Sequence, residues 1–207
     1  MPQNQIQSIS KTTDNKYLNM YAFLIETKAG QKGTYSVASR ASEVSSLDAV
    51  TKKTRGDVSA VFAIYGEAKD HVVLIKQYRF PLNDYVYEFP AGLIENGESL
   101  KETAIRELFE ETGLEFVPEN VNEAFTRPYY SSVGMSDESV GIVYGYAKGT
   151  PNTNNKEVAE DIEVVIADRD MCKQILRKEK VSLLCAYMLM AFIHSKGENP
   201  FAFTEES

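Results

Sequence analysis

The chain has 207 residues, of which 43% are hydrophobic and 25% charged, and its formal net charge is -8. This length fits one large domain, or one domain with a small appendage. The negative charge argues against nucleic acid and anionic membranes as partners, and no apolar run is long enough to span a bilayer. An anionic substrate would therefore need a local cation.

The N-terminal segment MPQNQIQSISKTTDNK is polar and lacks the apolar core of a signal peptide. Cys172 and Cys185 are too few for a disulfide framework or a zinc site, and Cys185 lies in an apolar run typical of a protein core. These features predict a cytoplasmic protein.

β-Rich segments dominate the first half of the chain. Residues 17–27 and 33–41 flank the glycine-containing turn KAGQKG and predict a β-hairpin. Further strands are expected at 57–66, 71–80, 84–92, 138–149 and 160–168. Helices are expected at 100–112 and in the runs RDMCKQILRKEK and SLLCAYMLMAFIHSKG, the last ending at Gly197. We therefore predict an α+β protein with a small N-terminal β unit, residues 1–56, followed by a mixed-sheet domain, residues 57–207.

The helix at 100–112 carries signals at both ends. Ser99 and Glu102 form a capping box, and Gly113 stands where a left-handed cap is expected. At about 100° per residue, one broad arc is apolar and is expected to pack on the sheet. This arc consists of Ala104, Ile105, Leu108 and Phe109.

Glu107, Glu110 and Glu111 lie together on a different arc, and Arg106 can reach Glu110 one turn away. Like charges at this spacing oppose helix formation by a few tenths of a kcal/mol per pair. The arc is either a solvated acidic face or a metal site, since hard divalent cations such as Mg²⁺ take carboxylate oxygens as ligands.

The surrounding spacing decides between these interpretations. It reads Gly92, five residues, Glu98, seven residues, Arg106-Glu107-Leu108, one residue, Glu110-Glu111, one residue, Gly113-Leu114. This resembles the Nudix box of the Nudix hydrolases at every specified position. The resemblance implies an α/β/α sandwich and metal-dependent hydrolysis of a nucleoside diphosphate linked to another group. The expected cofactor is Mg²⁺, with Mn²⁺ as an alternative.

The same resemblance assigns roles within the box. The metal ligands would be Glu107, Glu110 and Glu111, with the backbone carbonyl of Ala91. Glu110 would thereby also belong to the catalytic set, and Arg106 would act in catalysis by orienting and neutralising the glutamates. Glu98 would support the site from the loop.

Segment 74–99 resembles the ADP-ribose pyrophosphatase subfamily, in which Gln-Tyr-Arg precedes Glu-Phe-Pro-Ala-Gly. By that resemblance Arg79 contacts the substrate phosphates and Glu88 shapes the pocket; otherwise they are a surface arginine and a salt-bridged strand end. Segment 127–139 is also similar and adds Gly134 to the substrate site. Val133 replaces the usual proline, and the chain has no tryptophan to stack the base, so Tyr35 or another aromatic residue would do so.

The general base is expected outside the box, because the box glutamates would be committed to metal. In similar enzymes it comes from a loop after the post-box strand. The corresponding loop, residues 154–164, offers Glu157, Glu160 and Asp161, and Glu160 matches the subfamily position best.

The sequence thus predicts hydrolysis of ADP-ribose or a related nucleoside diphosphate sugar, a small-molecule substrate. The alternatives are a housecleaning nucleoside triphosphate pyrophosphatase and a non-catalytic ADP-ribose sensor. A lone hairpin is marginal in water, so the N-terminal unit is expected to pack against a second copy in a homodimer.

Overall fold

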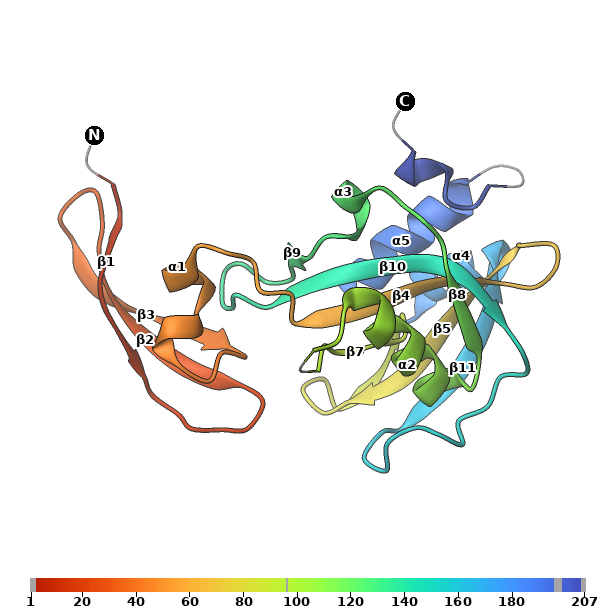
Figure 1. Ribbon diagram of the computed structural model, residues 1–207, viewed down its shortest axis with the longest axis horizontal. Coiled ribbons are helices and arrows are strands. Elements are labelled where there is room, and N and C mark those ends of the chain that lie inside the picture. Colours follow the sequence, from red (N-terminus) through yellow and green to blue (C-terminus); the bar gives the residue numbers. More distant parts are fainter. Residues whose placement is uncertain (1–2, 96, 196–198, 206–207) are drawn as a thin grey trace. The chain divides into compact units, whose positions relative to one another are not determined.

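The computed structural model describes residues 3–95, 97–195 and 199–205. The chain forms two compact units (Figure 1). The smaller unit contains the residues up to Asp57 together with Pro128–Val140, and the larger unit contains Val58–Arg127 and the residues from Gly141 onward. The sequence pattern had not indicated that residues 128–140 belong with the N-terminal segment.

The smaller unit is built on an antiparallel sheet of β1 (Gln5–Lys11), β2 (Asn19–Glu26) and β3 (Lys32–Ser39). The hairpin of β2 and β3 was predicted, but β1 was not, because its sequence is mostly polar. Tyr21, Phe23, Ala41 and Leu47 form its buried core. The remaining elements of this unit are η1 (Val44–Ser46), α1 (Asp48–Thr51) and β9 (Tyr129–Tyr130).

The sheet of the larger unit has the strand order β11-β5-β4-β10-β8, with β6 beside β5 and β7 beside β4. Its strands are β4 (Val58–Tyr65), β5 (His71–Arg79), β6 (Asp84–Glu88), β7 (Ala91–Leu93), β8 (Glu115–Pro118), β10 (Ser139–Lys148) and β11 (Ile162–Asp168). Its helical elements are α2 (Leu100–Thr112), α3 (Glu123–Thr126), α4 (Arg169–Lys178), α5 (Leu183–His194) and η2 (Ala202–Thr204).

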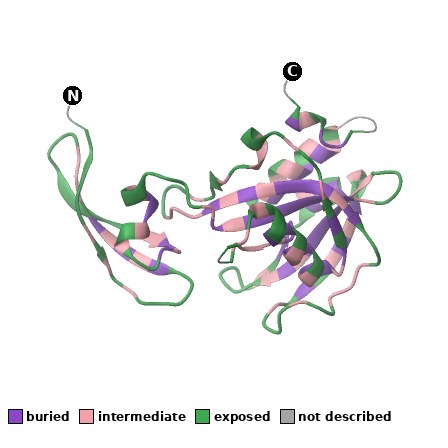
Figure 2. Ribbon diagram, in the orientation of Figure 1, coloured by how far each residue is buried: buried purple, intermediate pink, exposed green. Residues whose placement is uncertain are grey.

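Alternate side chains of the central strands enter two separate cores, as the period of two in a strand requires. Val61 and Ala63 of β4 pack with Ala104 and Leu108 of α2. Phe62 and its neighbours on the other face pack with side chains of α4 and α5. Figure 2 shows these strands as largely buried. The expected α/β/α sandwich and α+β class are thus confirmed.

The packing face of α2 differs from the expected one. Ala104 and Leu108 are buried, but Ile105 and Phe109 are about half exposed, with exposed fractions of 43% and 48%. Thr103, Glu107, Glu111 and Thr112 are buried instead. The helix is therefore rotated so that its acidic edge, rather than its second apolar row, turns inward.

Two other local expectations differ from the structure. The strand predicted at 84–92 ends at Glu88, and Ala91–Leu93 forms the separate strand β7, which pairs with β4. The predicted helix stop at Gly197 lies outside the described residues.

Among the residues that the structure describes, no helix is long and apolar enough to cross a membrane. Cys172 and Cys185 are both buried free thiols, and burial raises the pKa of the Cys172 thiol to about 12.

Candidate metal and substrate site

Helix α2 begins and ends at the residues its caps select. The Ser99 hydroxyl accepts from the backbone N–H of Glu102, and the Glu102 carboxylate accepts from the N–H of Ser99. Gly113 ends the helix with φ 68°, in the left-handed region that glycine adopts without strain. These two caps fix which turn of the helix presents the three glutamates.

Arg106 holds the acidic residues of the box together. Its guanidinium donates to Glu107 at 2.6 Å, to Glu110 at 3.0 Å and to both carboxylate oxygens of Glu98 at 2.9 Å. It also donates to the carbonyl of Leu93 at 3.1 Å. Arg106 lowers the pKa of Glu98 to about 2, and hydrogen bonds from Thr103 and the Glu95 backbone act in the same direction. The structure thus brings Arg106 to the glutamates, as expected for an orienting residue.

Glu111 and Glu107 are buried carboxylates with raised pKa values. Glu111 is 2% exposed, and burial, followed by the charges of Glu107 and Glu160, raises its pKa well above the usual value. Burial likewise raises the pKa of Glu107, although the Arg106 guanidinium opposes this shift. Two buried carboxylates that repel each other are costly unless a cation or a proton neutralises them.

Strand β7 lies directly against these two residues. The N–H of Ala91 donates to Glu111 at 3.2 Å. At Gly92, a Cβ atom would lie 1.7 Å from a carboxylate oxygen of Glu107, so a side chain at this position is excluded. Glycine is required here by close approach, and it brings the Ala91–Gly92 backbone to the glutamate edge.

The donor chemistry of this edge fits a hard divalent cation, which takes carboxylate and carbonyl oxygens. In the conformation described, Glu107 and Glu110 are paired with Arg106, and Glu111 with the Ala91 N–H. No group of three acidic, histidine or cysteine side chains in the described residues is already arranged around a cation position. Each of these contacts uses one carboxylate oxygen, so the second oxygen of Glu107, Glu110 and Glu111 is the one that would face a cation.

Arg79 and Glu88 lie close to this edge in the same unit. The Arg79 guanidinium donates to Glu88 at 2.6 Å, and its charge acts on Glu111 and Glu160, favouring their ionised forms. The two residues that the sequence assigned to the substrate are thus an ion pair within electrostatic reach of the buried glutamates. Arg79 thus places a cationic side chain near the buried glutamates in a protein of net charge -8.

The two candidate general bases differ in their surroundings. Glu160 is partly buried, and its burial raises its pKa; its charge in turn acts on Glu107 and Glu111. Glu157 is exposed, and its backbone N–H donates to the Glu160 carboxylate at 3.1 Å. The structure brings Glu160 within electrostatic reach of the box, whereas Glu157 is placed to orient Glu160.

Gly134 lies in the smaller unit, where its carbonyl accepts from the Tyr35 hydroxyl at 2.5 Å. The Ala38 N–H donates to the carbonyl of Met135 at 2.8 Å, so this loop is joined to β3. Tyr35 is 45% exposed. The loop with Val133 and the aromatic residue considered for base stacking thus belong to one local structure.

Sequence reasoning missed two residues that hold the base loop. The Asn152 N–H donates to the carbonyl of Thr112 at 2.8 Å, which anchors the loop at the C-terminal end of α2. The Lys156 ammonium donates to the backbone carbonyl of Glu160. Neither residue belongs to the box spacing, and only the position of Lys156 four residues before Glu160 hinted at a local contact.

With this geometry in place, comparisons with known proteins identify the family. The NUDIX domain model matches residues 54–172. An ADP-ribose pyrophosphatase of Escherichia coli O6:H1 is 30% identical over 155 residues, covering 70% of this chain and 72% of that protein. The methanol dehydrogenase activator of Bacillus methanolicus is 33% identical over 125 residues, covering 59% of this chain and 63% of that protein.

Among solved structures, one titled as an ADP compounds hydrolase superposes with a TM-score of 0.61 at 19% identity, covering 85% of this chain and 84% of that one. This similarity supports the fold. The chain belongs to the Nudix family and is a Nudix hydrolase, within which it is similar to the ADP-ribose pyrophosphatases.

Proposed function

We propose that the protein hydrolyses the pyrophosphate bond of ADP-ribose or a related nucleoside diphosphate sugar, giving a nucleoside monophosphate and a sugar phosphate. The observation that carries the proposal is the juxtaposition of the buried Glu107–Glu111 pair, the Ala91–Gly92 backbone and the Arg79–Glu88 ion pair. The similarity to a relative named ADP-ribose pyrophosphatase supports this substrate class.

Mg²⁺, or alternatively Mn²⁺, would be held by Glu107, Glu110, Glu111 and the carbonyl of Ala91. A bound divalent cation supplies neutralisation of the phosphate oxygens and a more acidic water. Arg106 keeps the carboxylates oriented on one edge of α2, since it already contacts Glu107, Glu110 and Glu98.

Arg79 is proposed to bind the substrate phosphates, and Glu160 to remove a proton from the attacking water. Arg79 exchanges its contact with Glu88 for the substrate phosphates, a charge-assisted interaction that binds and orients the anion. Glu160 takes the proton from the attacking water, because its partly buried carboxylate has a greater proton affinity than an exposed one. From the resemblance alone, we also propose substrate contacts for Gly134 and for an aromatic residue, Tyr35 or another, in place of the stacking tryptophan that this chain lacks.

The proposal is tested by incubating the purified protein and Mg²⁺ with ADP-ribose, other sugar nucleotides, dinucleoside polyphosphates and dNTPs, and identifying the products by chromatography. We expect AMP and ribose 5-phosphate from ADP-ribose. Faster turnover of dNTPs would indicate a nucleoside triphosphate pyrophosphatase, and tight ADP-ribose binding without turnover would indicate a sensor; either result contradicts the proposal.

The assignment of the general base is tested separately with a matched pair of variants. Glu160→Gln should lower kcat by about 10²–10⁴-fold with little change in metal affinity, because it removes only the proton acceptor. Glu157→Gln keeps the backbone N–H that contacts Glu160 and should retain most activity. The opposite ranking would assign the base to Glu157, and full activity of both variants would exclude both glutamates as the base.

A further inference from the structure

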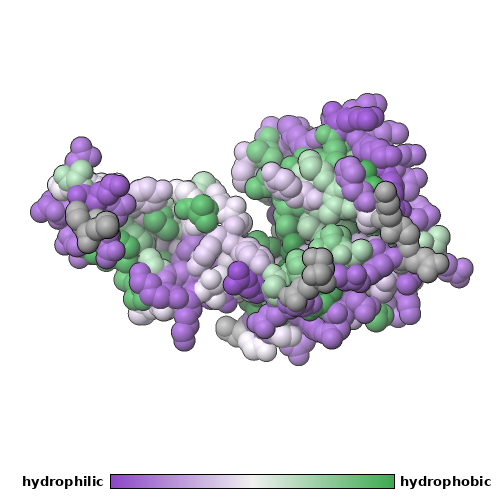
Figure 3. All heavy atoms as spheres, turned by 90° about the horizontal axis from the view of Figure 1, so that it is seen from above, coloured by the Kyte–Doolittle hydropathy of each residue, from purple (hydrophilic) through white to green (hydrophobic). Residues whose placement is uncertain are grey.

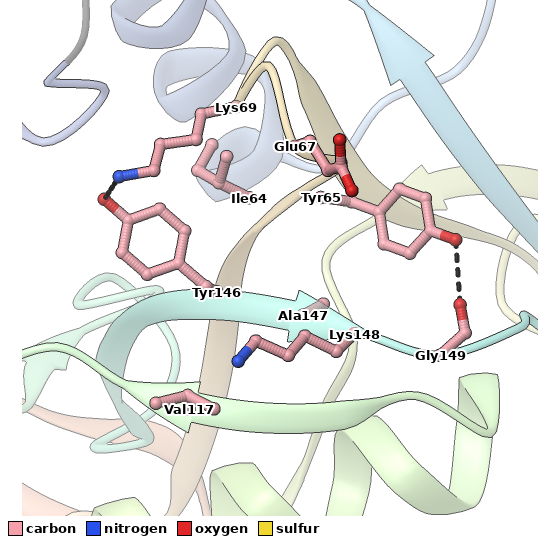
Figure 4. Close-up of a pocket in the computed structure, with 10 residues that line it drawn as sticks. Ile64, Tyr65, Glu67, Lys69, Val117, Tyr146, Ala147, Lys148 and Gly149 are labelled. Atoms are coloured by element: carbon pink, nitrogen blue, oxygen red, sulfur yellow. Dashed lines mark hydrogen bonds between the residues drawn. The ribbon is translucent and has the colours of Figure 1, made fainter.

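One buried amide of the larger unit, that of Gln77 in β5, carries an oxygen without a hydrogen-bond partner. Gln77 is 6% exposed, and its Oε1 atom makes no hydrogen bond with any residue that the structure describes. At the far end of the same sheet, by contrast, the Tyr65 hydroxyl donates to the carbonyl of Gly149 at 2.8 Å (Figure 4). A buried amide oxygen that lacks a donor is unfavourable, so its presence calls for a physical reason.

Gln77 lies on the face of the sheet that packs against α2. Side chains alternate along a strand, and Val73, four residues earlier in β5, packs with Leu108 of α2. The side chain of Gln77 is therefore on the same face as the box glutamates. Its partners in register are Val86 of β6 and Ile162 of β11, which are both buried. Their apolar side chains cannot donate a hydrogen bond to the amide.

The Arg79–Glu88 ion pair runs past the position of Gln77. In the register of β5 and β6, Glu88 is opposite Ile75, whereas Arg79 lies four residues beyond Ile75 on the same face. This separation is about 13 Å along the strand. The Nε atom of Arg79 is nevertheless 2.6 Å from the Oε2 atom of Glu88. The two side chains therefore reach toward each other along the face on which Gln77 lies between them.

Arg79 has the hydrogen-bond donors that the amide oxygen lacks. A guanidinium carries five N–H groups, and Glu88 accepts from the one on Nε. The two terminal nitrogens make no hydrogen bond with any described residue. The phosphates of a substrate and ionised glutamates only accept. The Lys76 ammonium lies on the opposite face, 5.5 Å from the centre of the Tyr87 ring. A bound water is the remaining alternative donor.

We propose that Gln77 is a positioning residue for Arg79. When Arg79 leaves Glu88 for the substrate phosphates, the Oε1 atom of Gln77 accepts one of its terminal N–H groups and fixes the plane of the guanidinium. The amide oxygen is thus unpaired in the free protein and paired in the complex, so this hydrogen bond favours the substrate-bound state. The inference rests on the proposed function only in that Arg79 binds the phosphates of the substrate.

Gln77→Met tests this role, because methionine has a similar size but only a weakly accepting sulfur. The substrate is the compound that wild type hydrolyses fastest, whichever its class. A class other than nucleoside diphosphate sugars would contradict the proposed function, whereas the comparison of variants would still test Gln77. KM should rise about tenfold, the effect of losing a hydrogen bond to a charged group, and kcat should change by less than about twofold.

Thermal melts distinguish positioning from a structural role. Free Gln77→Met should melt at or above the wild-type temperature, because it no longer buries an unpaired oxygen. Gln174→Met makes the same change at an exposed position of α4 and should alter neither KM nor the melting temperature. A lower melting temperature of Gln77→Met with an unchanged KM would show that Gln77 only supports the sheet, and would overturn the proposal.

A double-mutant cycle with Arg79→Met separates action through Arg79 from a bound water or a direct substrate contact. Once Arg79 has been removed, adding Gln77→Met should raise KM by less than about twofold, because the group that Gln77 holds is already absent. A further tenfold rise of KM in the Arg79→Met background would show that Gln77 acts without Arg79, and the proposal would be wrong.

Discussion

Glu111 is a carboxylate whose burial strongly disfavours its charged form. It is 2% exposed, its pKa is raised, and the groups that disfavour its charge include Glu107 and Glu160. Such a carboxylate lowers the free energy of unfolding when no cation is bound and becomes favourable when one is. Function and stability are thus opposed at this position.

We therefore predict opposite effects of Glu111→Gln with and without metal. Without divalent cations, the variant should melt at a higher temperature than wild type, by about 2–4 °C per kcal/mol of relieved repulsion. Mg²⁺ at about 100 times its dissociation constant should stabilise wild type by about 2.7 kcal/mol but should hardly stabilise the variant. The variant should also lose about 100-fold or more in kcat.

Thermal melts in EDTA and in Mg²⁺, together with initial rates, measure these effects. The control is Glu115→Gln, which neutralises an exposed carboxylate at the start of β8. An Mg²⁺-induced rise in melting temperature as large in Glu111→Gln as in wild type would show that Glu111 does not bind metal.

The pKa of Glu98 is shifted in the opposite direction from that of Glu111. Arg106 holds its folded pKa at about 2, below the value of about 4.3 in an unfolded chain. A depressed carboxyl pKa contributes stability above the unfolded pKa, and this contribution is lost as the pH falls from about 5 to 2. Wild type should therefore lose melting temperature more steeply than Glu98→Gln over this range. If the melting temperatures of the two proteins fell equally between pH 5 and pH 2, Glu98 would not have the lowered pKa that this prediction assumes.

At the scale of elements, α2 and the base loop are joined at one point. Gly113 ends the helix with φ 68°, and a Cβ atom there would lie 2.2 Å from the Asn152 amide nitrogen. Asn152 begins the stretch that leads to Glu160 and donates from its backbone to Thr112. The C-cap of α2 therefore also anchors the start of the loop that carries the proposed general base.

Gly113→Ala should consequently lower the free energy of unfolding by more than the strain of holding an alanine in the left-handed backbone conformation. Gly66→Ala is the matched control, since Gly66 has φ 90° but only ordinary contacts, at 3.9 Å. The control should lose about 1 kcal/mol, and Gly113→Ala about 1–3 kcal/mol more because Asn152 must shift. Chemical denaturation measures both. Gly113→Ala should also lower kcat, whereas Gly66→Ala should not. If both variants lost the same stability and the same kcat, the proposed coupling between the helix cap and the base loop would be wrong.

The sequence predicted those elements whose bounds are set by residues nearby in the chain. The bounds of α2 followed from Ser99, Glu102 and Gly113, and the central strands from their β-branched runs. Strand β1 was missed because its buried partners come from β2. The inward turn of Glu107 and Glu111 was also missed, because it results from the close approach of β7 at Gly92, a contact that no helical periodicity contains.

At the scale of the whole molecule, the sequence did not reveal that residues 128–140 belong with the N-terminal segment. The contacts that join them are long-range: Asp57 accepts from the N–H of Ser139, and Arg40 pairs with Glu138. Such pairs leave no spacing pattern in the chain. The proposed ligands and bases, in contrast, come from segments with recognisable motifs, and so their identity could be anticipated even where their contacts could not.

The predicted homodimer also concerns the whole molecule, and the structure replaces the reason for expecting it, which was the instability of a lone hairpin. The hairpin of β2 and β3 is not alone, because β1 pairs with the edge of β2 and Leu47 packs against Tyr21 and Phe23 within the smaller unit. That unit nevertheless has a small core, and it leaves Ile6, Leu24 and Tyr35 each about 45% exposed. Figure 3 shows hydrophobic residues at the surface of this unit among hydrophilic ones.

A small domain that exposes apolar side chains gains stability by burying them against a second copy. We therefore predict that the protein is a homodimer at micromolar concentration, with twice the monomer mass of 23.2 kDa in light scattering. Leu24→Glu should shift it toward monomer, because a charge at an apolar interface is costly to bury, whereas Lys28→Glu, in the adjacent turn, should not. A monomer mass for wild type would refute the dimer, and a dimer that survives Leu24→Glu would place the interface on another surface.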